Sequence, residues 1–234
     1  MSVHVGVSGF SYPGWRGRFY PEEAKSEDFL RLYAKRLGSV EINSSFYAPP
    51  RAEVVEGWAG RTGAEFRFSF KAPKMITHVK KLGEGASEAA LQFSKRLEAL
   101  GPRGGPILFQ LPPFSRANEG LLEEFLSATK GIDGKVFEFR HESWLVEDTY
   151  QLLDRYGAGF CVAETGDMKP VLKVTGDLAY FRLRLESYDA KAVEAWAPKI
   201  KKTMKDAGEG YVYLRHDETG GNAVLAEALS RKLG

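Results

Sequence analysis

The chain has 234 residues, of which 43% are hydrophobic and 27% are charged, a composition typical of globular proteins with a full core. The formal net charge of +2 is too small to indicate nucleic acid or an anionic membrane as a partner. The single cysteine, Cys161, excludes a disulfide within the chain and any cysteine-rich metal motif. The start "MSVHVGVSGFSY" shows no signal-peptide pattern, and no window approaches a membrane span, so we expect a cytoplasmic protein with no membrane partner.

Eight short β-rich runs recur along the chain. In order they are "VHVGVS" from residue 3, "SVEINS" from 39, "EFRFSFKA" from 65, "PILFQL" from 106, "KVFEFR" from 135, "GFCVAE" from 159, "LAYFRLRL" from 178 and "YVYLRH" from 211. Helical spacing predicts helices at 26–37, 86–100, 118–130, 147–156, 192–207 and 220–233. The segment after the sixth run, "TGDMKPVLKVTG", is more typical of a loop.

This alternation predicts parallel strands joined by right-handed helical crossovers. Eight repeats without a linker favour an α/β fold with a single domain over residues 1–234, a closed, parallel, eight-stranded (β/α)8 TIM barrel. An open doubly wound sheet is the alternative. It would usually carry a glycine-rich phosphate turn after its first strand, and "SGFSYPGWRG" lacks that spacing.

Alternate residues of a barrel strand point to the interior, and active sites of this fold lie at the carboxyl ends of the strands. The polar residues of each run share one parity, which predicts that they face the barrel axis. Three carboxylates (Glu41, Glu138 and Glu164) then face six cations (Arg67, Lys71, Arg140, Arg182, Arg184 and Arg215), with His216 as the alternative to Arg215. This local excess of positive charge favours an anionic ligand.

These side chains supply the candidate site residues. Glu138 is the candidate general base, Glu41 a second candidate carboxylate, and His141 or His78 the candidate acid. The predicted ligand-binding residues are Asn43, Tyr47, Lys71, Gln110, Arg140, Trp144, Arg182, Arg184, Tyr188 and Arg215, where cations clamp the anion and aromatic rings form stacking walls. The alternative is a structural layer in which the buried charges pair among themselves.

No cofactor is predicted. A divalent metal is less favoured than an anion because of the cationic surplus and because no H-E-x-x-H or similar close spacing is present.

Five ordered motifs carry a family resemblance. "VEINSSFYAPP", "FRFSFKAPKMITH", "GPILFQLPPFS", "FEFRHESW" and "GGNAVLAEAL" resemble the YecE-like family, a domain-of-unknown-function family of TIM-barrel proteins. The resemblance spans essentially the whole chain and implies the barrel. It departs near the end, where members often read "RLHG" and "YFNND" and this chain reads "RLRLESY" and "YLRHD". Arg184, Arg215 and His216 at these positions make the predicted mouth more basic.

Three functional hypotheses follow. The first is a hydrolase, lyase or isomerase acting on a small anionic substrate that bears a phosphate or carboxylate. The second is a nucleic-acid-binding or repair protein, by fold analogy with barrels similar to endonuclease four. The third is a non-catalytic ligand-binding module. The sequence assigns neither a substrate nor an oligomeric state.

Overall fold

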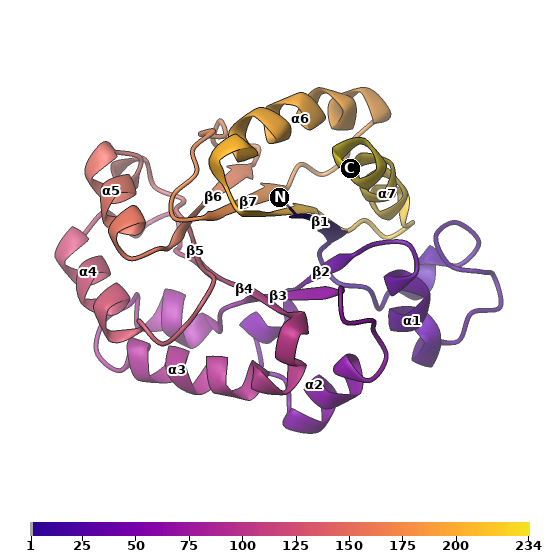
Figure 1. The fold of residues 1–234 in the computed structure, drawn as a ribbon, viewed down its shortest axis with the longest axis horizontal. Helices are drawn as coiled ribbons and strands as arrows, with labels where there is room; N and C mark the ends of the chain where they lie inside the picture. Colours follow the sequence, from indigo (N-terminus) through magenta and orange to yellow (C-terminus); the bar gives the residue numbers. More distant parts are fainter. Residues whose placement is uncertain (1) are drawn as a thin grey trace.

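The computed structural model describes residues 2–234, and its eight strands form one parallel sheet (Figure 1). The sheet order is β1-β8-β7-β6-β5-β4-β3-β2. The strands are β1 (Ser2–Val7), β2 (Ser39–Ile42), β3 (Arg67–Lys71), β4 (Gly104–Gln110), β5 (Lys135–Glu138), β6 (Gly159–Glu164), β7 (Leu178–Leu183) and β8 (Glu209–Leu214). All eight lie at the predicted places, which confirms the α/β barrel.

The barrel closes between β1 and β2. Ser8 and Glu41 form a parallel bridge, and the backbone N–H of Gly9 donates to the carbonyl of Glu41 at 2.9 Å. Deeper in the barrel the hydroxyl of Tyr33 spans the seam: it accepts from the N–H of Val7 at 2.9 Å and donates to the carbonyl of Ser39 at 2.8 Å. A Cβ at Gly6 would lie 1.9 Å from that carbonyl oxygen, so β1 approaches this closely only because position 6 is glycine.

Helices surround the sheet. They are α1 (Phe29–Ala34), α2 (Ala52–Ala59), α3 (Ala86–Leu97), α4 (Glu119–Ala128), α5 (Glu147–Arg155), α6 (Ala190–Thr203) and α7 (Gly221–Leu233). The short helices are η1 (Pro13–Trp15), η2 (Ser26–Asp28), η3 (Ser44–Phe46), η4 (Met75–Val79), η5 (Glu98–Arg103), η6 (Glu142–Trp144) and η7 (Met204–Asp206). A loop joins β6 to β7, as predicted, whereas α2 has no counterpart among the predicted ranges.

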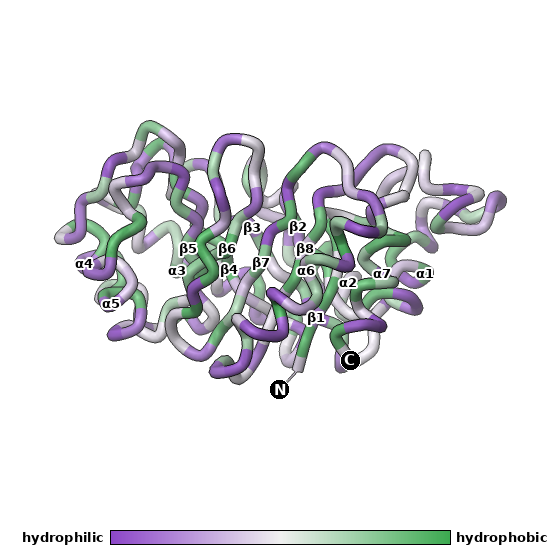
Figure 2. The backbone as a smooth tube through the Cα atoms, turned by 90° about the horizontal axis from the view of Figure 1, so that it is seen from above, coloured by the Kyte–Doolittle hydropathy of each residue, from purple (hydrophilic) through white to green (hydrophobic). Residues whose placement is uncertain are grey.

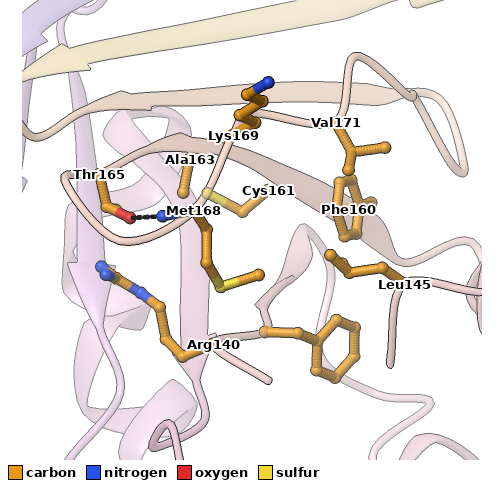
Figure 3. A pocket seen from close by; sticks show the side chains of 10 residues that line it. Arg140, Leu145, Phe160, Cys161, Ala163, Thr165, Met168, Lys169 and Val171 are labelled. Carbon is orange, nitrogen blue, oxygen red and sulfur yellow. Dashed lines mark hydrogen bonds between the residues drawn. The ribbon is translucent and has the colours of Figure 1, made fainter. Parts of the chain in front are cut away.

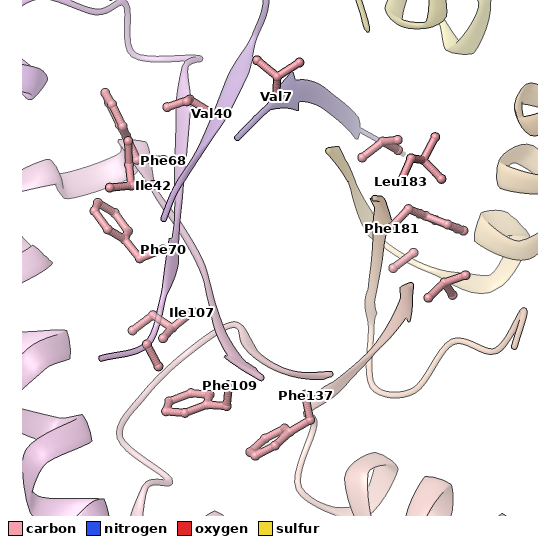
Figure 4. Packing of buried hydrophobic residues seen from close by; sticks show 14 of the residues in the cluster. Val7, Val40, Ile42, Phe68, Phe70, Ile107, Phe109, Phe137, Phe181 and Leu183 are labelled. Carbon is pink, nitrogen blue, oxygen red and sulfur yellow. The ribbon is translucent and has the colours of Figure 1, made fainter. Parts of the chain in front are cut away.

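The outer face of the sheet carries the main hydrophobic core. Phe68, Phe70, Phe109 and Phe137 are fully buried and point outward from the strand ring toward the helices (Figure 4). Each contributes roughly 1.5–3 kcal/mol by leaving water. Figure 2 shows the strands as largely hydrophobic and the loops at the barrel ends as largely hydrophilic. Because these residues face the helices, the residues that alternate with them along each strand face the barrel axis.

A separate apolar layer fills the barrel interior below its mouth. It consists of Leu108, Val136, Cys161, Leu178, Tyr180, Tyr211 and Tyr213. The hydroxyl of Tyr213 shares hydrogen bonds with Ser39 and with Ser69, the latter at 2.7 Å. The barrel is therefore plugged at this level, and polar groups above the plug face the carboxyl ends of the strands.

No helix within residues 2–234 is both long and apolar enough to cross a membrane.

Candidate functional site

Inward-facing polar side chains converge at the carboxyl ends of the strands. We call this set the cationic cup: Glu41, Asn43, Lys71, Gln110, Glu138, Arg140, Arg182, Arg184 and Arg215. Three of its members, Glu41, Glu138 and Arg182, are buried, whereas the remaining six are half-buried. The cup thus has a dry ionic floor and a rim that solvent and ligands reach.

Arg182 is the centre of the floor. Its Nε and Nη2 donate to the two carboxylate oxygens of Glu41 at 2.8 and 2.9 Å, and its Nη1 donates to Glu138 Oε2 at 2.5 Å. Weaker contacts reach Gln110 at 3.5 Å and Asn43 at 3.4 Å. A buried ion pair survives only when its geometry is good and its remaining hydrogen-bonding positions are filled, and Arg182 meets both conditions.

Glu41 is saturated with donors. Besides Arg182 it accepts from the Tyr180 hydroxyl at 3.0 Å, Asn43 Nδ2 at 2.8 Å and Ser8 Oγ at 3.4 Å. Burial alone would raise the pKa of this carboxyl, but the charge and hydrogen bonds of Arg182 outweigh it and lower the pKa to about 2. Glu41 is therefore ionised at neutral pH and orients its neighbours.

Glu138 is held in the same way. It accepts from Arg182 and from Arg140 Nε, and the Cys161 thiol lies 3.9 Å from its Oε2. Burial opposes ionisation, yet Arg182 and Arg140 together keep the pKa of Glu138 below its usual range. A carboxylate with a lowered pKa is a weak base, so this geometry favours a positioning role over the predicted role of general base.

Three cations of the cup, Lys71, Arg184 and Arg215, have no carboxylate partner within residues 2–234. Lys71 Nζ lies 4.0 Å from the ring centroid of Phe46, and Arg184 donates through Nη1 to Ser8 Oγ. Burial and the nearby Arg182 lower the pKa of Lys71 to about 8 and that of Arg184 to about 10. Burial is the larger cause of both shifts, and repulsion by Arg182 adds to it.

Two charges of the predicted set lie elsewhere. Glu164 was expected at the mouth, but Cys161 and Ala163 take the inward positions of β6, so Glu164 points outward and accepts from Trp196 Nε1 at 3.0 Å. Arg67 begins β3 at the opposite end of the barrel, where it lies 4.0 Å from Glu209. Both placements correct the sequence-based expectation, and the cup retains two carboxylates against five cations.

The two predicted histidines lie on rim loops. His141 Nδ1 contacts Ser143 Oγ at 2.9 Å and accepts from the Ser143 N–H at 3.1 Å, so it caps η6. His78 Nδ1 contacts Thr77 Oγ1 at 2.9 Å, and its ring packs edge-on against Phe46 at 4.9 Å. His78 therefore shares Phe46 with Lys71, whereas no contact within the described chain joins His141 to the floor.

The three predicted aromatic walls differ in their surroundings. Trp144 is buried, stacks on Phe139 at 4.6 Å and donates to the carbonyl of Ser115 at 2.8 Å, which makes it part of the core. Tyr188 donates to the outward-facing Glu164 at 2.7 Å. Tyr47 is 83% exposed beside Phe46, so it alone of the three is free to stack on a ligand.

Sequence reasoning missed Ser8, which touches both Glu41 and Arg184. The alternation of His4, Gly6 and Ser8 in the first strand carries the signal, because these positions share the inward parity. Within residues 2–234 no group of three or more His, Cys, Asp and Glu side chains is close enough to hold a metal ion.

Comparison with known proteins places this architecture in a family. The profile described as "Protein of unknown function DUF72" matches residues 4–234. The chain belongs to the DUF72 family. It is 30% identical over 155 residues to the UPF0759 protein YecE of Escherichia coli (strain K12), which covers 65% of this chain and 54% of YecE. The UPF0759 protein YunF of Bacillus subtilis (strain 168) is 27% identical over 165 residues, covering 64% of this chain and 54% of YunF.

This DUF72 chain spans about half the length of the curated relatives it matches. The crystal structure of a DUF72 family protein from Thermotoga maritima resembles it with a TM-score of 0.85 at 27% identity, covering 100% of this chain and 99% of that one. The family resemblance predicted from the five motifs is therefore confirmed, as is the barrel. The family description assigns no reaction, and the function of a protein with a widely used fold is set by its site.

Two cavities border the cup of this DUF72 protein. The smaller, of about 20 Å³, has room for about one water molecule beneath the loop between β6 and β7; Arg140, Cys161 and Met168 line it (Figure 3). The larger, of about 300 Å³, lies between the loops that follow β1 and β2. We call the larger one the side pocket; it is lined by Gly9, Phe10, Ser11, Tyr12, Ile42, Asn43, Ser44 and Trp58.

Proposed function

We propose that this DUF72 protein binds a small anionic ligand, bearing a carboxylate or a phosphate, in the cationic cup. One observation carries the proposal: Lys71 and Arg184 face the cup without a carboxylate partner among the described residues, although Glu41 and Glu138 are fully committed to Arg182 and Arg140. A cytoplasmic location is part of the proposal.

Electrostatics supports this interpretation. Taking a cation out of water without a partner is costly, and the lowered pKa values of Lys71 and Arg184 reflect that cost. An anion seated between them would supply the missing partner and strengthen both charges. The floor adds rigidity, since Arg182, Glu41 and Glu138 hold one another in place before any ligand arrives.

Asp217 bears on where the anion binds, because it occupies the other candidate anion site. Barrels of this fold often bind phosphate near the loops after their last two strands, at a helix amino terminus. Here Asp217 fills the amino terminus of α7 by accepting from the N–H groups of Thr219, Gly221 and Asn222 at 2.8, 3.1 and 2.6 Å. We therefore place the ligand at Lys71 and Arg184.

The side pocket indicates a second property of the ligand. It adjoins the cup through Asn43, whose side chain contacts both Glu41 and Arg182, and its walls include the rings of Phe10, Tyr12 and Trp58. A volume of about 300 Å³ is at the lower end for small-molecule sites. We propose that an apolar substituent of the anion occupies it.

Isothermal titration calorimetry tests the proposal with acetate, pyruvate and phosphate, and with neutral acetamide as the control ligand. Arg184→Met should weaken anion binding by about tenfold or more, because it removes one of the cup's unpaired cations. Arg155→Met, which removes an exposed arginine on α5, is the matched control and should leave binding unchanged. Equal binding of acetamide, or equal affinities of both variants, would contradict the proposal.

A second candidate function is binding of single-stranded nucleic acid. The observation that favours it is a pair of exposed rings on rim loops, Tyr47 at 83% and Phe114 at 66%, with Lys81 Nζ 5.1 Å from the Phe114 ring centroid. Such rings can stack on bases while lysines contact phosphates. Fluorescence anisotropy with a labelled oligonucleotide should show binding that weakens steeply with salt and is reduced in Phe114→Ala; salt-independent binding would exclude this function.

A further inference from the structure

Lys71 is the one cation of the cup that carries an amine, a group that can act as a nucleophile. Lys71 ends β3 with its side chain directed inward, and the hydroxyl of Ser45 donates to its carbonyl at 2.7 Å, which fixes the backbone. Nζ itself lies over the ring of Phe46 and makes no hydrogen bond or ion pair within residues 2–234. The amine is therefore positioned by its stem and leaves its reactive end to a ligand.

The surroundings of this amine favour its neutral, nucleophilic form. Burial and the repulsion of Arg182 lower the pKa of Lys71 to about 8, so roughly one molecule in ten carries the free amine at pH 7. The thiol of Cys161 also faces the interior, but it is fully buried, and burial raises its pKa. The charged groups that act on Lys71 are Arg182, Glu138, Glu41 and Arg184, and His78 lies close enough to be affected by it in turn.

We propose that Lys71 forms a Schiff base with the carbonyl carbon of a small 2-oxo acid whose carboxylate is bound by Arg184. The inference rests on the proposed function and names its substrate class. The Nζ lone pair forms a bond to the carbonyl carbon, and the carbonyl oxygen takes protons and leaves as water. One proton enters from solvent in the overall reaction, so that amine, oxo acid and proton give a protonated imine and water.

The floor of the cup suits this intermediate. The iminium carries the same single positive charge as the lysine ammonium, so the balance among Arg182, Glu41 and Glu138 is unchanged when the imine forms. Glu138 stays ionised under the influence of Arg182 and Arg140, and its negative charge favours the cationic imine. The side pocket is available to the substituent on the carbonyl carbon. In this proposal Arg184 binds the carboxylate, Lys71 attacks the carbonyl carbon, and the side pocket takes the substituent.

Reductive trapping tests the proposal. The protein is incubated with pyruvate and cyanoborohydride. Its intact mass is then measured, and peptide mapping locates any adduct. We expect a gain equal to one pyruvic acid less one oxygen atom, located at Lys71 and absent in Lys71→Met. Lys74→Met, which removes an exposed lysine three residues away, is the matched control and should be labelled like the wild type. Because mapping of the wild-type protein locates the adduct, the test holds even if Lys71→Met folds poorly.

Comparing lactate with pyruvate, for binding and for adduct formation, separates this proposal from the one it rests on. Lactate has the carboxylate but no carbonyl, so it should bind in calorimetry and give no adduct. Binding of pyruvate without an adduct at Lys71, or labelling spread evenly over exposed lysines, would overturn the Schiff base and leave anion binding intact. Failure of both pyruvate and lactate to bind would instead overturn the proposed function.

Discussion

Replacing Lys71 by methionine should stabilise the ligand-free protein. The pKa of Lys71 is lowered from 10.5 to about 8, and at ~1.36 kcal/mol per pKa unit this corresponds to at most about 3.4 kcal/mol of destabilisation when the charge is buried at pH 7. Solvent screening of the half-buried amine reduces this, so we expect a gain of about 1–2 kcal/mol. Methionine has a similar length and keeps a favourable contact with the ring of Phe46.

The pH dependence makes this prediction specific. The pKa of Lys71 is lower in the folded than in the unfolded protein, so between about pH 8 and 10.5 the unfolded state binds more protons. Stability contributed by this group therefore rises with pH across that window. The advantage of Lys71→Met in urea unfolding should shrink at pH 10 to roughly a quarter of its value at pH 7. A variant that is less stable than the wild type at pH 7, or whose gain is the same at both pH values, would refute this reasoning.

Three other outcomes are expected. Arg182→Met leaves two buried carboxylates without their shared partner and should lower the free energy of unfolding by about 3–5 kcal/mol in urea denaturation; a loss below about 1 kcal/mol would show that the floor is not the ionic network described. Affinity for acetate, measured by calorimetry, should fall as the pH rises above about 8 because Lys71 loses its proton. An affinity that stays the same from pH 7 to pH 10 would contradict this. Ser44→Tyr should fill the side pocket and lower the calorimetric binding affinity for phenylacetate more than that for acetate. Equal losses of affinity for the two ligands would place the apolar group elsewhere.

The barrel was predictable because its signal repeats. Each strand gives the same alternation of apolar and polar residues, so one rule places Phe68 and Phe70 against the helices and Lys71 in the mouth. The two misplaced charges are a residue of the outward parity and a residue at the wrong depth. Glu164 has the wrong parity for the interior, and Arg67 has the right parity but lies at the amino end of its strand.

The pairing of charges was beyond the sequence. Arg182 reaches Glu41 across 141 positions of the chain and Glu138 across 44, and only the closed barrel sets these distances. The sequence shows an excess of cations, but it does not show which of them are paired. In the structure Arg182 and Arg140 form ion pairs with the buried carboxylates, whereas Lys71 and Arg184 do not. Trp144 illustrates the same limit, since its position after the fifth strand suits both a stacking wall and the core position that it occupies.

The most direct test of anion binding in the cationic cup is a crystal structure of the protein grown with saturating pyruvate. We expect a carboxylate within hydrogen-bonding distance of Arg184, with the ligand reaching Lys71 and the pairing of Arg182 with Glu41 and Glu138 unchanged. Pyruvate found solely on exposed surface lysines, or Lys71 and Arg184 turned out to solvent with the cup closed, would contradict it.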